Sequence, residues 1–171
     1  MTFGIIIKPV GQLTAMEKSR MSEVERICFE GEESGIEWSP SDWVVLGLLD
    51  GMIVSQICVL EREVDVGGEK IRVGGVGGVA THPDYRQKGY AGKLLQASEQ
   101  FFHELDLPFG VLVCGEEKRP YYASFGWVKI ENRTIFQNEG QDREMDGTMM
   151  ILPLKEFTWP DGLLNLNGKP W

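Results

Sequence analysis

Two glycine turns divide one stretch of the chain into three strand-like runs, and this pattern constrains the fold more than any other feature. Residues 44–49 and 52–60 are rich in apolar and branched side chains and flank Asp50-Gly51, a dipeptide typical of tight hairpins. Gly67-Gly68 marks a second hairpin and returns the chain as a third run over 70–79. The pattern therefore predicts an antiparallel meander.

Helices and further strands are expected on both sides of this meander. A β-branched run at the start predicts a strand over 3–8, and apolar residues at helical spacing predict a helix over 14–29. The later elements are expected in the order helix 91–105, strand 109–114, short helix 117–125, and strands 127–130, 134–137 and 148–152. This order predicts the α+β class, as one domain over residues 1–171 with a mixed, mostly antiparallel central sheet flanked by helices.

The chain is strongly acidic, and this limits the partners that it can bind. Its 171 residues include 17 Lys and Arg against 26 Asp and Glu, so the formal net charge is −9. Proteins that bind nucleic acid or anionic membranes need a basic face. We therefore expect no nucleic-acid partner and no membrane partner, whereas a cationic partner and simple solubility fit the charge equally well.

Cysteine and histidine are too few and too scattered for a metal site. The chain holds Cys28, Cys58 and Cys114 without a C-x-x-C pair, and its histidines are His82 and His103. A structural zinc site needs four ligands at close spacing, so no metal is expected. Unpaired thiols, the lack of a secretion signal and the shortness of the longest apolar run together predict a cytoplasmic protein.

A glycine cluster at the end of the meander matches a nucleotide-binding pattern that we reject. Gly75-Val-Gly77-Gly-Val-Ala80 fits G-x-G-x-x-A, the fingerprint that binds a dinucleotide where a strand turns directly into a helix. Here the following residues are Thr81-His82-Pro83-Asp84, which do not open a helix. We interpret the glycines as part of a strand that another backbone or a ligand approaches closely.

The next glycine-containing loop, residues 86–92, predicts an anion site instead. It follows a strand and opens a leucine-rich helix, where backbone N–H groups lack helical acceptors and the helix dipole favours negative charge. Gly89 and Ala91 are small enough for a phosphate to approach the backbone. Three basic side chains add positive charge in an otherwise acidic chain: Arg86, Lys88 and Lys93.

Two signatures give the chain a family resemblance. The R-x-x-G-x-A pattern of Arg86, Gly89 and Ala91, after a strand that ends at Thr81, resembles the acetyl-CoA site of the GNAT N-acetyltransferases. Downstream, Tyr121-Tyr122-Ala-Ser-Phe-Gly126-Trp127 is similar to the second signature of that family, usually Phe-Tyr-x-x-x-Gly-Phe. The resemblance implies acetyl-CoA as the cosubstrate and a cofactor-binding core over about residues 70–130.

The resemblance also implies which residues hold the cofactor. The pantetheine arm is expected to bond to the backbone of one strand end, formed by Val79, Ala80 and Thr81. The pyrophosphate is expected on the loop and helix start, formed by Arg86, Gln87, Lys88, Gly89, Tyr90, Ala91 and Gly92.

In such enzymes the acetyl group passes directly to a primary amine, with no covalent enzyme intermediate. The resemblance implies that the backbone N–H of Val79 holds the oxyanion and that Tyr122 is the general acid. A phenol has an unperturbed pKa near 10, so it is protonated at neutral pH and can donate to a leaving thiolate. The alternative is a non-catalytic acyl-CoA-binding sensor, which has no need of Tyr122.

A narrower resemblance concerns the acceptor. Four parts of the chain are similar to the aminoglycoside 2′-N-acetyltransferases: residues 28–38, residues 122–127, Asp146-Gly-Thr with Leu152-Pro153, and a final tryptophan. This implies an acidic pocket for a small cationic amine, completed by the tail over about 153–171 and formed by Glu32, Glu37, Asp146 and the carboxylate of Trp171. A protein or peptide amine is the alternative acceptor.

Two positions depart from that subfamily. Gly77 stands where the subfamily has a glutamate, which is a natural place for a residue that relays protons through water, so the base is not identified, and Glu32 and Glu37 remain possible. Lys169 stands where the subfamily has an aspartate. Both changes remove negative charge from the expected pocket. A homodimer is expected only by analogy with families of this kind.

Overall fold

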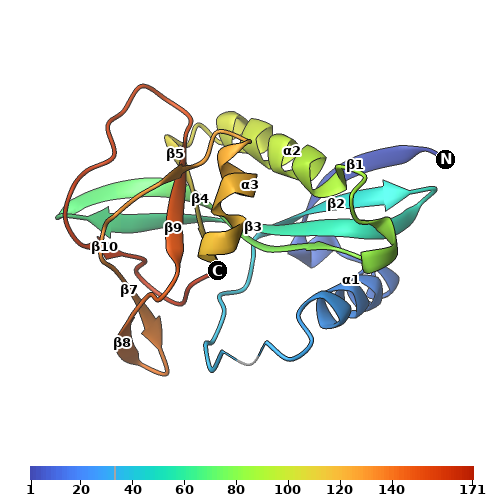
Figure 1. The fold of residues 1–171 in the computed structure, drawn as a ribbon, viewed down its shortest axis with the longest axis horizontal. Helices are drawn as coiled ribbons and strands as arrows, with labels where there is room; N and C mark the ends of the chain where they lie inside the picture. The colour runs from blue at the N-terminus through green and yellow to red at the C-terminus, as the bar shows by residue number, and fades with distance from the viewer. Residues whose placement is uncertain (33) are drawn as a thin grey trace. The chain divides into compact units, whose positions relative to one another are not determined.

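The computed structural model describes residues 1–32 and 34–171, which are drawn as a ribbon in Figure 1. The chain divides into two compact units, each made of three stretches. The first unit consists of Met1–Ser34, Ser41–Leu60 and Val76–Ser98. The second unit consists of Gly35–Pro40, Glu61–Gly75 and Glu99–Trp171. Three long elements contribute residues to both units: strands β3 (Met52–Val66) and β4 (Glu69–Thr81) and helix α2 (Tyr90–Glu104).

The strands of the first unit form the expected meander. Strand β1 (Phe3–Pro9) runs antiparallel to β2 (Trp43–Leu49), and β2 runs antiparallel to β3. Asp50 and Gly51 both have positive φ, 48° and 84°, as a tight turn between right-twisted strands requires. The predicted hairpin is therefore confirmed. A register shift between Gly47 and Leu48 interrupts the β2–β3 ladder.

Helix α1 (Ala15–Cys28) begins at a capping box. The Thr14 hydroxyl accepts the Glu17 N–H at 3.2 Å, and the Glu17 carboxylate accepts the Thr14 N–H at 2.8 Å. The same carboxylate pairs with Lys8 of β1 at 2.9 Å. The bond from the Thr14 backbone, followed by that from Lys8, holds the pKa of Glu17 below its usual value. The helix start is thus tied to the strand beside it.

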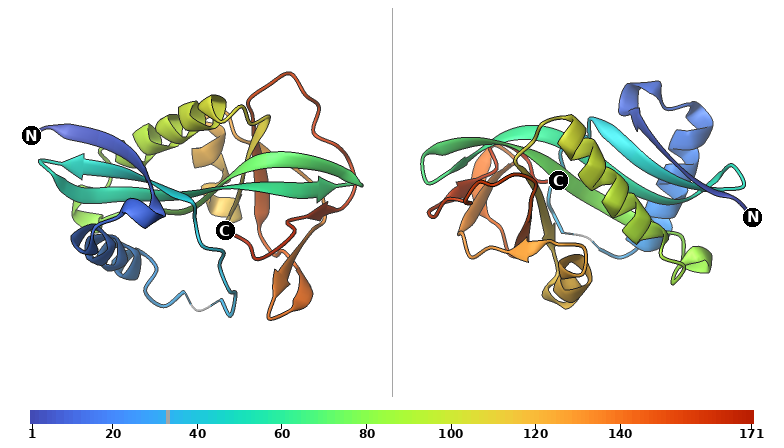
Figure 2. Two further views of the ribbon diagram at one scale, coloured as in Figure 1. Left: turned by 180° about the vertical axis from the view of Figure 1, so that it is seen from behind. Right: turned by 90° about the horizontal axis from the view of Figure 1, so that it is seen from above.

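The two helices of the first unit cover opposite faces of its strands (Figure 2). On one face Met21 of α1 packs against a core that includes Val44 and Leu46. On the other face Gly47 lies beneath Phe3 and Leu94 of α2, and an added Cβ would fall within about 3 Å of both side chains. Successive residues of β2 therefore face opposite helices, because the side chains of a strand alternate between its two faces.

The second unit is built on a mixed sheet. Its strands are β5 (Phe109–Cys114), β6 (Val128–Lys129), β7 (Thr134–Asn138), β8 (Gln141–Glu144), β9 (Thr148–Pro153) and β10 (Leu164–Asn165). Residues 73–75 of β4 pair in parallel with residues 109–111 of β5, and β9 lies antiparallel to both β5 and β6. On the other side β10 joins β3 to β7, and β8 pairs with β7. The α+β class with a mixed, mostly antiparallel sheet is confirmed.

Several local expectations need correction. The helix expected over 117–125 is a 3₁₀ turn, η3 (Glu116–Lys118), followed by the short helix α3 (Arg119–Ala123). Strand β8 is not foreseen, because its Gln-Asp-Arg-Glu sequence has no apolar alternation. The tail over residues 153–171 contains β10 and further backbone hydrogen bonds, so it is an ordered part of the second unit. None of the described helices is long and apolar enough to cross a membrane.

Side chains, rather than a ligand or another backbone, make the close approach to two glycines of β4. A Cβ at Gly74 would lie 2.5 Å from the ring of Phe102, and a Cβ at Gly75 would lie 2.5 Å from the indole of Trp171. Both positions therefore need glycine because an aromatic ring occupies the space of a side chain. The sequence pattern predicts a close approach to this strand, but it does not identify the aromatic side chains that make it.

Replacing Gly74 by alanine should destabilise the protein by about 1–3 kcal/mol, since overpacking of a filled core costs that much. Phe102 is 1% exposed and has little room to move. Urea unfolding measures the change, with Gly4→Ala as the control, because a Cβ there would meet no described atom within 4 Å. Equal stability of the two variants would contradict the packing argument.

Candidate functional site

The end of β4, in the first unit, departs from regular strand geometry. Gly78 has a φ of +56°, the left-handed conformation that glycine takes in a β-bulge. Its Cα also faces Cys58, whose Sγ would lie 3.1 Å from an added Cβ. A left-handed residue changes the direction of the backbone groups that follow it, and the next residue is Val79.

The two residues after Val79 are held by hydrogen bonds to their carbonyl oxygens. Ser55 Oγ donates to the Ala80 oxygen at 3.1 Å and lies 2.8 Å from Thr81 Oγ1. The Thr81 oxygen accepts from Cys28 Sγ at 3.3 Å and from Arg86 Nε at 3.1 Å. Arg86 therefore fixes the start of the loop to the end of the strand, in addition to supplying charge.

The loop itself combines a short 3₁₀ turn with two left-handed residues. In η2 (Pro83–Tyr85) His82 Nδ1 accepts the Asp84 N–H at 3.3 Å, so this histidine has a structural role. Gln87 and Gly89 have φ of 61° and 74°. Such residues turn successive N–H groups toward one side of a loop, which makes a concave surface for an anion.

Helix α2 begins directly after Gly89. The Lys93 N–H donates to the Gly89 oxygen at 3.1 Å, and the N–H groups of the three residues between them lack helical acceptors. The first turn reads Tyr90-Ala-Gly-Lys93, so its only charged side chain is basic. Loop and helix start thus form one site suited to a phosphate group.

Aromatic rings hold the side chains around this loop. Tyr90 stacks on Phe3 with ring centroids 4.2 Å apart, and Lys93 Nζ lies 5.3 Å from the centre of the same Phe3 ring. Lys88 Nζ lies 5.4 Å from the centre of the Tyr85 ring. Cations over ring faces are attracted to them, so both ammonium groups stay beside the loop.

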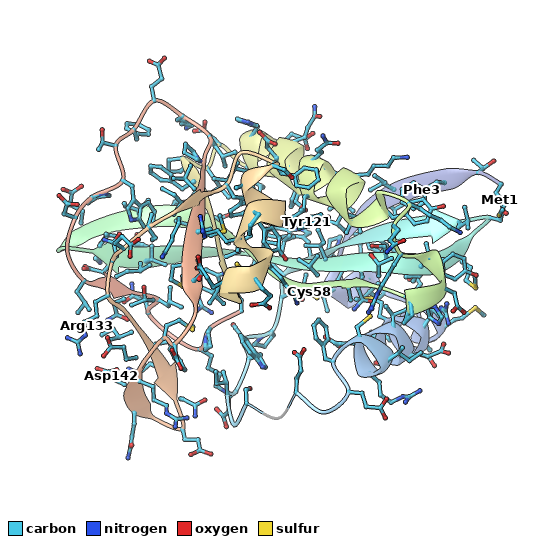
Figure 3. The ribbon with its side chains drawn as sticks, in the orientation of Figure 1. Met1, Phe3, Cys58, Tyr121, Arg133 and Asp142 are labelled. Carbon is cyan, nitrogen blue, oxygen red and sulfur yellow. The ribbon has the colours of Figure 1, made fainter. Side chains whose placement is uncertain are left out.

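Tyr122 lies on α3, in the second unit. Its side chain is 7% exposed, whereas that of Tyr121, which projects from the same helix, is 42% exposed (Figure 3). Burial, followed by repulsion from Cys114 once its thiol ionises, raises the pKa of Tyr122 above the ordinary value for a phenol. Tyr122 is therefore protonated throughout the physiological pH range.

Glu37 is also in the second unit, within a segment that β7 holds in place. The side-chain oxygen of Asn138 accepts the Glu37 N–H at 2.7 Å, and its amide nitrogen donates to the Gly35 oxygen at 3.2 Å. Asn138 is 3% exposed, so this anchor is buried. The Glu37 carboxylate lies 2.9 Å from Lys169 Nζ in the tail.

Arg62 joins the Glu37 segment to the tail. Its Nη2 donates to Ser39 Oγ at 2.7 Å, and its Nη1 donates to the backbone oxygen of Lys169 at 2.5 Å and to that of Leu166 at 3.3 Å. A backbone bond of 2.7 Å runs beside these contacts, from the Ser39 N–H to the Pro170 oxygen. We call residues 35–40 and 166–171, together with Arg62, the tail clasp.

Trp171 anchors the tail clasp in the core of the second unit. Its indole Nε1 donates to the Val111 oxygen of β5 at 3.1 Å, and its side chain is 8% exposed. The Arg62 guanidinium lies 5.0 Å from the centre of the Trp171 ring. The indole thus has a packing role, and it is this ring that crowds Gly75.

The four residues expected in the acceptor pocket lie in different parts of the structure. Glu37 and Trp171 both belong to the tail clasp. Asp146 is exposed between β8 and β9, in the same unit. Glu32 is exposed in the first unit, where its N–H bonds to the Phe29 oxygen. Sequence reasoning misses Arg62, Ser39 and Asn138, because single polar residues in strands and loops carry no motif.

The described residues contain no group of three or more His, Cys, Asp or Glu side chains that could hold a metal ion. What they do provide is a helix start at α2 with free N–H groups and basic side chains nearby, a buried phenol on α3, and a partly exposed carboxylate in the tail clasp.

A family model described as "Acetyltransferase (GNAT) domain" matches residues 11–130. The chain therefore belongs to the GNAT family of acetyltransferases, and the expected acyltransferase class is confirmed. Enzymes of this family use acetyl-CoA as the acetyl donor, and the phosphate-binding character of the loop before α2 fits such a molecule.

Individual relatives agree with this assignment. Aminoglycoside 2′-N-acetyltransferase from Mycolicibacterium fortuitum is 27% identical over 131 residues, which are 74% of this chain and 67% of the relative. The GNAT family N-acetyltransferase YhbS from Escherichia coli, solved in complex with CoA, has a similar fold with a TM-score of 0.69 and 16% identity. The matched region covers 98% of this chain and 92% of YhbS. An acyl-CoA N-acyltransferase from Pseudomonas aeruginosa has a TM-score of 0.63 and 18% identity, and the match covers 88% of this chain and 99% of that protein.

Proposed function

We propose that this protein transfers the acetyl group of acetyl-CoA directly to a primary amine of a small cationic acceptor, a class that includes aminoglycosides. The observation that carries the proposal is the loop before α2. Two left-handed residues, Gln87 and Gly89, lead there into a helix start with no acidic side chain. This arrangement supports binding of the cofactor pyrophosphate by residues 86–92.

The proposed roles at the strand end follow from the left-handed conformation of Gly78. Acetyl-CoA supplies the acetyl group as a thioester. The amine must be neutral to attack, so its proton passes to water or to a base that no side chain is assigned to supply, and the attack places negative charge on the carbonyl oxygen. A backbone N–H directed at that oxygen stabilises the charge, and Val79, which follows the left-handed Gly78, is our candidate. The bonds that fix Ala80 and Thr81 support a strand end rigid enough to position the pantetheine arm.

Tyr122 is our candidate for the general acid. The CoA thiolate must gain a proton as the tetrahedral intermediate collapses, and a group that is protonated at neutral pH can donate it. Burial of Tyr122 and the resulting rise of its pKa support this role. The neighbouring Tyr121 is half exposed and serves as the natural control.

The acceptor is proposed to bind through carboxylates. Glu37 is held by the buried Asn138, which supports a defined position for its carboxylate. Asp146 and Glu32 are exposed carboxylates that we keep in the proposal, together with Trp171. The named relative from M. fortuitum supports an aminoglycoside as one member of the acceptor class.

Release of CoA from acetyl-CoA, followed by thiol detection, tests the proposal. The purified protein is incubated with aminoglycosides, polyamines, amino acids, simple monoamines and a lysine peptide. We expect turnover with small amines. Turnover with the lysine peptide alone would replace the acceptor part of the proposal. If acetyl-CoA binds but no amine releases CoA above the hydrolysis background, the proposal is wrong.

A further inference from the structure

Lys169 places a positive charge directly on the carboxylate that we assign to the acceptor. Its Nζ lies 2.9 Å from Glu37 Oε2, within contact distance of an ion pair. Both side chains are 48% exposed, so the carboxylate can also be reached by a molecule in solution. A cationic acceptor that binds Glu37 must therefore compete with an ammonium group of the protein itself.

The backbone of Lys169 is fixed, and this makes the competition effective. Arg62 Nη1 donates to the Lys169 oxygen at 2.5 Å, and the Ser39 N–H donates to the oxygen of the next residue, Pro170, at 2.7 Å. Trp171 then enters the core of the unit. A group held on a short tether acts at an effective concentration of the order of millimolar, which a free ligand must exceed.

Lys169 also opposes a polycation through its own charge. Its ammonium group lies beside Glu37 in the tail clasp, which also contains the Arg62 guanidinium and the Trp171 carboxylate that we assign to the acceptor. An acceptor with one ammonium group loses that charge when its reacting nitrogen becomes neutral. A polyamine or aminoglycoside keeps further positive charges, which the Lys169 ammonium group repels.

We propose that Lys169 is a specificity-determining residue that directs the enzyme toward amines carrying a single positive charge and away from polycations. This inference rests on the proposed function, because it narrows the acceptor class of the same site. Lys169 acts by occupying Glu37, so its effect requires the Glu37 carboxylate.

The test compares Lys169→Met with Lys70→Met at low ionic strength. Lys70 pairs with Glu63 at 3.4 Å and is 71% exposed, so its replacement removes the same charge and one ion pair elsewhere in the second unit. For Lys169→Met we expect a KM for spermidine and for an aminoglycoside about tenfold lower than that of the unmodified protein, and a monoamine KM within about twofold. Lys70→Met should change neither value by more than about twofold.

A double-mutant cycle tests whether Lys169 acts through Glu37. In a Glu37→Gln background, Lys169→Met should change the spermidine KM by less than about twofold, because the shared partner is gone. An equal gain in both backgrounds, or equal shifts for monoamines and polyamines, would overturn the inference.

Calorimetric measurement of spermidine binding distinguishes a failure of this inference from a failure of the proposed function. If no variant acetylates any amine, the proposed function fails. Even then, tighter spermidine binding by Lys169→Met than by Lys70→Met supports Lys169 as the group that blocks Glu37. Equal binding by the two variants counts against it.

Discussion

Replacement of Tyr122 by phenylalanine is expected to lower kcat by about 10²- to 10⁴-fold, the usual contribution of a positioned general acid. The change removes one oxygen from a side chain that is 7% exposed and leaves its ring in place. The KM for acetyl-CoA should change little, because the loop over residues 86–92, our proposed cofactor loop, lies in the first unit and keeps all its contacts. Steady-state CoA release, with thermal unfolding as a check on folding, measures both values.

The control for this prediction is Tyr121→Phe, which removes the same oxygen from the adjacent residue. It should retain kcat within about twofold, since Tyr121 is 42% exposed. Similar losses in the two variants would remove Tyr122 from the mechanism.

The pH profile provides a second check on Tyr122. A general acid works only while it is protonated, and burial raises the pKa of this phenol above its ordinary value near 10. Raising the pH toward 10 should therefore not lower kcat through loss of this proton. A fall in kcat between pH 8 and about 9.5, present in the unmodified enzyme and absent from Tyr122→Phe, would show an acid with a much lower pKa.

The second large effect is expected at the cofactor loop, where Gly89→Val should raise the KM for acetyl-CoA by about 10- to 100-fold. Gly89 has a φ of 74°, a conformation that costs a β-branched residue about 1–3 kcal/mol. The loop must leave this conformation or keep the strain, and the new side chain also covers the backbone that a phosphate would approach. Initial rates over a range of acetyl-CoA concentrations measure the change.

The chain offers a closely matched control at Gly140. This glycine also has a φ of 74°, and at either position an added Cβ would meet no described atom within 4 Å. Gly140 lies in the turn between β7 and β8, in the second unit. Gly140→Val should therefore lose comparable stability and keep its KM for acetyl-CoA. A rise in KM in both variants would mean that general destabilisation, not the loop, causes the effect.

The parts of the fold that local rules determine are predictable from the sequence. The Asp50-Gly51 turn, the capping box at Thr14 and the helix that begins at Tyr90 depend on residues close together in the chain. The helix start and the positive charge of the loop over residues 86–92 are predictable for the same reason, because the glycine and the basic residues are contiguous with the helix.

The tail clasp could not be predicted, because its contacts join distant parts of the chain. Arg62 reaches Ser39 and Lys169, which are 23 and 107 residues away, and Asn138 reaches Glu37 over 101 residues. A lone arginine between two glutamates in a strand looks like ordinary surface. The resemblance led us to Glu37 and Lys169, but the ion pair between them required the structure.

The division of the chain also has a consequence for folding. Each compact unit is assembled from three separate stretches, and the second unit takes its first residues from 35–40 and its last from the tail. Neither unit can complete its core from a continuous fragment, so proteolytic excision of either should not yield a stable piece. Many contacts within each unit join residues that are far apart in the chain and therefore close long loops. Such topologies fold slowly, because the chain loses conformational entropy before the stabilising contacts form.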